Sequence, residues 1–196
     1  MIQTIVASIL AFAATNIDDI FILMLLYGNR RIASANILLG QLLGLGTLVF
    51  VSYIGSFIGS IIDQRFIGLL GLFPIYLAVT HTISLIRNNA EADEESAVPM
   101  KTTSLIAIAG VTIANGGDNI GVYVPLMATM DQFEKIQLIL VFGIMTYLWC
   151  VIARYLSNRP VIARQLEKYG HIAMPIVLFL LGVLILAESG TLSLII

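Results

Sequence analysis

Long apolar runs alternate along the chain with short polar connections that hold charged or turn-forming residues. An apolar run of about 20 residues is long enough to cross the hydrocarbon core of a bilayer as an α-helix. The pattern predicts six spanning helices, at Ile2 to Tyr27, Ile37 to Ile62, Phe66 to Ile86, Thr103 to Met130, Ile136 to Leu156 and Ile172 to Leu192. The expected fold is therefore an all-α polytopic membrane protein.

Composition supports this class and excludes others. Hydrophobic residues make up 59% of the chain and charged residues only 11%, whereas soluble domains carry about 25% charge. The single cysteine, Cys150, excludes an internal disulfide and any paired-cysteine metal or redox motif. It is best explained as a small apolar core residue. The net charge of −2 gives no indication of a nucleic-acid partner, so membrane lipid is the expected surrounding.

A polar, acidic segment at residues 89–101 divides the six spans into two sets of three, residues 1–88 and 102–196. The two halves resemble each other weakly. Thr15-Asn-Ile-Asp-Asp-Ile20 aligns with Asn115-Gly-Gly-Asp-Asn-Ile120, and Phe73-Pro74 aligns with Met174-Pro175. Because each unit has an odd number of spans, the second must be inverted across the bilayer. The pattern predicts two inverted three-helix repeats, an architecture of many secondary transporters.

The distribution of basic residues predicts the orientation of the chain. One face of the predicted bundle would hold only Arg65 and Lys135. The opposite face, formed by the first, third and fifth connections, would hold Arg30, Arg31, Arg87, Lys101, Arg154, Arg159, Arg164 and Lys168. Since basic residues concentrate on the cytoplasmic side, both termini are expected to be non-cytoplasmic.

Three carboxylates, Asp18, Asp19 and Asp118, lie deep inside predicted spans. Each costs roughly 2.5 to 3.5 kcal/mol at a helix centre, so neighbouring groups, water or a bound cation must offset them. Asn16 lies three residues before Asp19, and Asn115 lies three residues before Asp118. On a continuous helix, this spacing would place an amide and a carboxylate on one face.

The pair Gly116-Gly117 weakens the fourth span just before Asp118, and an opened turn there would free backbone carbonyls as further ligands. The predicted cluster is therefore built from oxygen atoms and carries negative charge. Such a cluster suits a metal cation and repels anions. It discriminates poorly among Cd²⁺, Zn²⁺, Mn²⁺ and Ca²⁺ except through cavity size and ligand number.

Other polar or small residues have simpler explanations. Gly40-x-x-x-Gly44 and Gly55-x-x-x-Gly59 are typical of close helix packing. His81 is expected at the membrane interface and Glu188 in water near the outer end of the last span. The sequence leaves open whether His81, Glu188 or Cys150 takes part in function.

The two motifs, Ala14-Thr-Asn-Ile-Asp-Asp-Ile20 and Ala114-Asn-Gly-Gly-Asp-Asn119, resemble those of the cadmium resistance transporter family within the lysine exporter superfamily. The resemblance covers essentially the whole chain. It implies a six-helix protein of the bacterial inner (plasma) membrane that exports Cd²⁺, with Zn²⁺ as a second candidate, without ATP hydrolysis and without a bound cofactor. The metal-binding candidates that it implies are Asn16, Asp18, Asp19, Asn115, Asp118 and Asn119.

Two further functions compete with metal export. The carboxylates could hold an ammonium group, which would make the protein an exporter of a basic amino acid or another organic cation. Two intramembrane aspartates could also form a protease dyad. The Gly-x-Gly-Asp pattern of such proteases fails here because Asn115 stands in place of the first glycine, so we expect no enzyme.

The three carboxylates also suggest a counter-ion. In a low dielectric they would repel one another, so at least one is expected to hold a proton when metal is absent. An arriving divalent cation would displace that proton, and this exchange predicts proton antiport. The oligomeric state stays open, a homodimer included.

Overall fold

The computed structural model describes residues 2–29, 31–57, 68–86 and 104–188. Within these ranges the chain is helical and has no strand, so the predicted all-α class is confirmed. The predicted linker at 89–101 lies outside the described residues. The elements are α1 (Ile2–Thr15), α2 (Asp19–Gly28), α3 (Ser34–Ser56), the 3₁₀-helix η2 (Gly68–Gly71), α5 (Leu72–Ile86), α6 (Leu105–Asn115), α7 (Gly117–Ala128), α8 (Gln132–Leu156) and α9 (Pro160–Glu188).

Among the described residues, α3 and α8 are by length and composition able to cross a membrane as single helices. The number of such spans rises to four if each of two bent helix pairs, α1 with α2 and α6 with α7, is counted as one. Shorter apolar helices cover Leu69–Ile83 and Met174–Ala187. Six spans therefore remain a prediction. The chain has helices able to cross a membrane whether two or four spans are counted.

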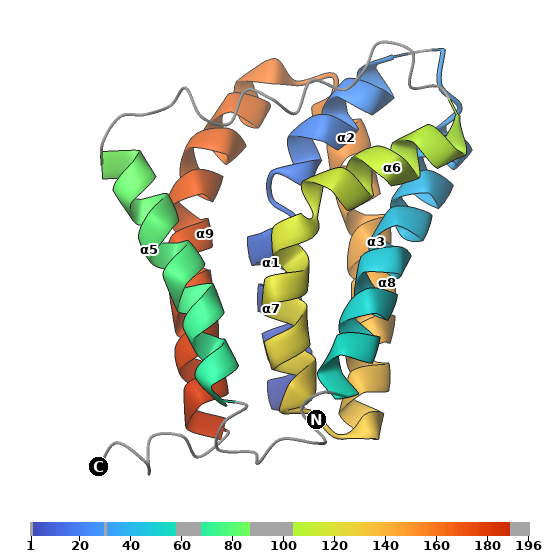
Figure 1. Cartoon of the computed structure of the whole chain (residues 1–196). Coiled ribbons are helices and arrows are strands. Elements are labelled where there is room, and N and C mark those ends of the chain that lie inside the picture. The colour runs from blue at the N-terminus through green and yellow to red at the C-terminus, as the bar shows by residue number, and fades with distance from the viewer. Residues whose placement is uncertain (1, 30, 58–67, 87–103, 189–196) are drawn as a thin grey trace.

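The first predicted span is not one helix, and neither is the fourth. α1 ends at Thr15 and α2 begins at Asp19, with a bend of 65° between them. α6 ends at Asn115 and α7 begins at Gly117, with a bend of 69°. Both breaks lie inside the bundle rather than at its ends (Figure 1). The sequence at Ile2 to Tyr27 does not indicate the first break. Asn16 and Asp18 are polar, but no glycine or proline stands beside them to favour the end of a helix.

Several predicted boundaries also shift. α8 begins at Gln132 and not at Ile136, because Asp131 and Glu134 form a reciprocal capping box. In that box the backbone N–H of Glu134 donates to Asp131 Oδ1 at 2.8 Å. α9 begins at Pro160, well before the predicted Ile172, and proline is well suited to the first position of a helix.

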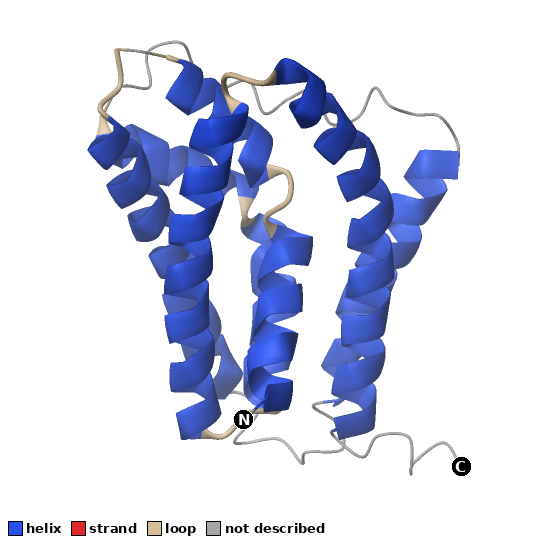
Figure 2. Cartoon of the chain, turned by 180° about the vertical axis from the view of Figure 1, so that it is seen from behind, coloured by secondary structure: helices blue, strands red, loops and turns tan. Residues whose placement is uncertain are grey.

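The packing pairs helices from different halves of the chain. α3 packs against α6 and α7, α8 packs against α1 and α2, and α5 packs against α9, which also contacts α1. Elements in corresponding places of the two halves run in opposite directions: α1 and α2 rise in Figure 1 where α6 and α7 descend, and α3 descends where α8 rises. α1 begins and α9 ends at the same end of the bundle, and Figure 2 shows the same arrangement from behind.

Glycines allow α3 and α6 to approach closely. A Cβ atom on Gly40 would lie 2.7 Å from Cβ of Ile108, and one on Gly44 would lie 2.6 Å from Cβ of Thr112. The predicted packing role of Gly40-x-x-x-Gly44 is therefore confirmed. Gly55 faces Val124 of α7, whereas Gly59 lies outside the described residues.

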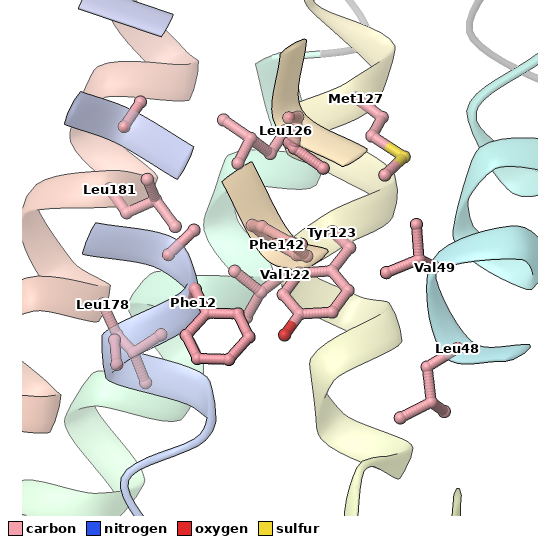
Figure 3. Close-up of a cluster of buried hydrophobic side chains, with 14 of the residues drawn as sticks. Phe12, Leu48, Val49, Val122, Tyr123, Leu126, Met127, Phe142, Leu178 and Leu181 are labelled. Carbon is pink, nitrogen blue, oxygen red and sulfur yellow. The ribbon is translucent and has the colours of Figure 1, made fainter. Parts of the chain in front are cut away.

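An aromatic and aliphatic core fills the space below the breaks. Phe12 of α1, Tyr123 of α7 and Phe142 of α8 are each at most 1% exposed, and their rings meet edge to face (Figure 3). The Phe12 and Phe142 centroids are 5.4 Å apart, and those of Tyr123 and Phe142 are 4.8 Å apart. Such pairs each contribute about 0.5 to 1.5 kcal/mol beyond their buried area. The core therefore supports the ends of α1 and α7 that carry the polar motifs.

Candidate functional site

Every predicted site residue lies at one of the two helix breaks. Asn16 and Asp18 belong to the turn between α1 and α2, and Asp19 is the first residue of α2. Asn115 is the last residue of α6. Asp118 and Asn119 lie in the first turn of α7. The positive end of a helix dipole favours carboxylates in a first turn, by about 0.3 to 2 kcal/mol, which offsets part of the cost of burying them.

The breaks overturn one sequence argument. Asn16 and Asp19 do not share a continuous helix, and neither do Asn115 and Asp118, so the spacing of three residues does not place either pair on one helix face. The relative positions of these side chains are set instead by contacts between helices.

Asn115 joins the two motifs. Its Nδ2 atom donates to Oδ1 of Asp19 at 2.7 Å and to Oδ2 of Asp18 at 3.1 Å. Residues almost one hundred positions apart in the sequence thus meet through one amide. The structure brings three of the six candidates, Asn115, Asp18 and Asp19, into direct contact.

Two residues that the sequence analysis did not select complete the surroundings of Asp19. Gln41 of α3 donates from Nε2 to Oδ2 of Asp19 at 2.9 Å, and Thr112 of α6 donates from Oγ1 to Oε1 of Gln41 at 2.7 Å. Gln41 and Thr112 are 5% and 4% exposed. Both oxygens of Asp19 therefore accept an amide hydrogen, one from each half of the chain. A glutamine alone in an apolar predicted span was the signal available in the sequence.

Three oxygen atoms of the motifs are left without a donor. Oδ1 of Asn16, Oδ1 of Asp18 and Oδ1 of Asn119 are buried and have no hydrogen-bond partner among the described residues. A buried oxygen without a donor costs about 1 to 3 kcal/mol, more when it is charged. Two of these oxygens lie at the first break and one at the second, and each can accept from a further donor or bind a cation.

Asp118 is half-buried and lies close enough to Asp18 for the two carboxylates to repel each other electrostatically. His81 of α5, also half-buried, lies within electrostatic range of Asp118. Even so, no three His, Cys, Asp or Glu side chains gather into a metal-binding group in the part of the chain that the structure describes. Any ion held here would need amide oxygens as well as carboxylates.

Cys150 does not belong to this oxygen-lined site. It is 3% exposed and belongs to a cluster of apolar residues from α2, α3, α6 and α8. Its predicted place in the apolar core is confirmed. The side chain of Glu188 lies outside the described residues.

The apolar helices α3 and α8, each able to cross a membrane, indicate a membrane protein. Its carboxylates and amides gather at the breaks of the two bent helix pairs. Sequence comparison then gives the family. The chain belongs to the cadmium resistance transporter family, whose model matches residues 12–196. No curated protein and no solved structure matched the chain. Membership confirms the resemblance carried by the two motifs and indicates transport linked to cadmium resistance rather than catalysis.

Proposed function

We propose that this protein exports divalent metal cations, Cd²⁺ and Zn²⁺, from the cytoplasm through a site formed by the two helix breaks. The observation that carries the proposal is the set of three buried acceptor oxygens without a donor, on Asn16, Asp18 and Asn119. Carboxylate and amide oxygens bind hard and borderline divalent cations, and the nearby Asp118 adds negative charge. Family membership supports cadmium as one such cation.

Asp18 and Asp19 have different roles in this proposal. Both oxygens of Asp19 accept protein amides, whereas Asp18 accepts one amide on Oδ2 and keeps Oδ1 for a ligand. Asp18 is therefore the carboxylate best placed to bind the ion first. Asp19 becomes a ligand only when the amide of Gln41 or Asn115 turns away.

The transport cycle that we propose is alternating access with proton antiport. Its support is the opposite direction of corresponding helices and their cross-packing, α3 on α6 and α7 and α8 on α1 and α2. Two inverted halves of this kind can rock about a fixed site and open it to either side. Repulsion among the carboxylates would favour a bound proton in the metal-free state, and the metal would release it, so metal leaves as protons enter.

The orientation of the protein is part of this proposal. Arg31 precedes the start of α3, Arg154 lies in the last turn of α8, and Arg159 precedes α9, so all three belong to one end of the bundle. Lys135 lies in the first turn of α8, at the end where α1 begins and α9 ends (Figure 1). The basic end would face the cytoplasm of a bacterial cell, in the inner membrane, and both termini would face away from it.

Direct counting of bound metal tests the site. The protein is purified in detergent, equilibrated with Cd²⁺ or Zn²⁺, and the metal per chain is measured for wild type, Asp18→Asn and Asp118→Asn. Each replacement removes a charge at nearly constant volume and should weaken binding at least about tenfold. Asp131→Asn, at the cap of α8 and outside the site, is the matched control and should bind as wild type.

Flux measurements test the coupling. In proteoliposomes that enclose a pH dye, Cd²⁺ transport should be accompanied by opposite proton movement, and Asp18→Asn should abolish both. Metal flux at an equal rate without a pH change would reject antiport while leaving metal transport intact. Transport of lysine or arginine with no response to Cd²⁺ would instead support the organic-cation alternative.

A further inference from the structure

The amide of Asn16 is held in one orientation by groups that all accept hydrogen bonds. Asn16 is fully buried, and its Nδ2 atom lies within hydrogen-bond distance of three acceptors: the backbone oxygen of Phe12 at 2.9 Å, Oγ1 of Thr15 at 2.9 Å and the hydroxyl of Tyr123 at 2.8 Å. The amide has two hydrogens, so one of them is shared between two of these acceptors. If the amide were flipped, its carbonyl oxygen would face the carbonyl of Phe12 without a donor there. Oδ1 therefore points away from these three groups.

The direction of each hydrogen bond follows from counting protons. The hydroxyl of Thr15 donates to the backbone oxygen of Ala11 at 2.9 Å, and a hydroxyl has a single proton to give. In its 2.8 Å contact with Tyr123, Thr15 must therefore accept. Tyr123 then donates to Thr15, which leaves the lone pairs of its oxygen free to accept from Asn16. A flipped amide could accept from Tyr123 only if the hydroxyl withdrew its proton from Thr15, so this hydroxyl and Thr15 together favour the observed orientation of the Asn16 amide.

Tyr123 is itself fixed. Its side chain is fully buried, and its ring packs edge to face on Phe142 of α8 (Figure 3). The backbone oxygen of Asn16 is held separately, because Nε1 of Trp149 donates to it at 2.7 Å. The turn that carries Asn16 is thus fastened by α7 and α8, both from the other half of the chain.

We infer that Tyr123 is a positioning residue, whose hydroxyl orients the Asn16 amide so that Oδ1 faces the transported cation. This inference rests on the proposed function, because it assigns Asn16 Oδ1 as a ligand. Tyr123 does not bind the ion. It acts through Asn16, and it makes the geometry of a ligand in the first half depend on a helix of the second half.

The experiment measures Cd²⁺ affinity by titration calorimetry on the full-length protein in detergent. Tyr123→Phe removes only the hydroxyl and should weaken Cd²⁺ binding about three- to tenfold, the range expected for one lost hydrogen bond. Tyr53→Phe is the matched control, since its hydroxyl donates to Gln132 outside the site, and it should bind as wild type. A second pair of variants tests the same contact without changing Tyr123. Thr15→Val removes the oxygen that accepts from Tyr123 and should weaken Cd²⁺ binding. Thr15→Ser keeps that oxygen and should bind Cd²⁺ as wild type.

A double variant separates positioning from a general structural effect. If Tyr123 acts only through Asn16, then Tyr123→Phe should not weaken Cd²⁺ binding further in an Asn16→Ala background. An equal loss in both backgrounds would overturn the inference. If Asp18→Asn loses Cd²⁺ binding while Tyr123→Phe binds as wild type, the inference about Tyr123 is overturned and the proposed function stands. Wild-type binding in Asp18→Asn would overturn the proposed function and this inference with it.

Discussion

Gln41 offers the sharpest test of how the buried charge of Asp19 is held. Replacing it with leucine keeps most of the volume but removes the amide that donates to Asp19 Oδ2 and the oxygen that accepts from Thr112. Thr112 can still donate to the backbone oxygen of Ile108, at 3.2 Å, so the main loss falls on Asp19.

The expected magnitude follows from the kind of bond lost. A hydrogen bond to a charged group contributes about 1.5 to 3 kcal/mol, and the carboxylate oxygen left without a donor stays buried, because Asp19 is only 4% exposed. Gln41→Leu should therefore lower the free energy of unfolding by about 1.5 to 3 kcal/mol, roughly a 10- to 150-fold change in the ratio of folded to unfolded protein. For a chain of this length, the melting temperature should fall by about 3 to 12 °C.

The assay is reversible unfolding in mixed detergent micelles, in metal-free buffer. Gln132→Leu is the matched control, because Gln132 is exposed, lies outside the site and loses only an exposed 3.1 Å bond from Tyr53, so it should change stability by no more than about 0.5 kcal/mol. A double-variant cycle with Asp19→Ala should show a coupling of about 0.5 to 3 kcal/mol between positions 41 and 19. Wild-type stability in Gln41→Leu, with no coupling, would refute the claim that this amide holds Asp19.

Two other predictions test the bundle itself. In a Cys150→Ala background, a cysteine at Asn158 should react only with reagent on the cytoplasmic side and one at Asp131 only with external reagent; the reverse result would invert the proposed topology. Gly44→Ala should destabilise the fold by about 1 to 3 kcal/mol, because its Cβ would approach the α6 backbone. The control Gly46→Ala has open space around its Cβ and should be neutral or stabilising by up to about 1 kcal/mol. Equal effects of the two substitutions on stability would contradict the close packing of α3 on α6.

The sequence predicts the helical class and the close packing at Gly40 and Gly44, and it marks the fourth span as weak at Gly116-Gly117, because each follows from the local pattern of residues. It does not predict the first break. The side chain of Asn16 donates to the backbone oxygen of Phe12 in addition to the helical bond from its own backbone N–H, and the free energies of a broken and a continued helix here differ little in isolation. Contacts with Tyr123 and Trp149 decide between them.

Gln41 and Thr112 show a second limit of the sequence. Neither belongs to a motif, and both lie in apolar helices where a single polar residue is often only a packing detail. Their role depends on how α3 is rotated about its axis relative to α2 and α6, and hydrophobic periodicity says little about rotation when a helix is apolar on most faces. A lipid-facing Gln41 would fit the same sequence as the buried one, and it is the buried orientation that meets Asp19.

Several buried polar groups at the breaks form hydrogen bonds between the two halves of the chain, and this bears on the transport mechanism. Asp18 and Asp19 of the first half bond to Asn115 of the second, and Asn16 bonds to Tyr123 of the second. Because an unsatisfied buried polar group is costly, the two halves cannot separate at the breaks unless water, a proton or a cation replaces these bonds. If the halves rock about this site, as proposed, the same bonds that hold the resting arrangement must be exchanged for bonds to the substrate. Substrate binding and the movement of the halves would then be one event, and a variant that weakens a bond across the breaks, such as Tyr123→Phe, should alter both together.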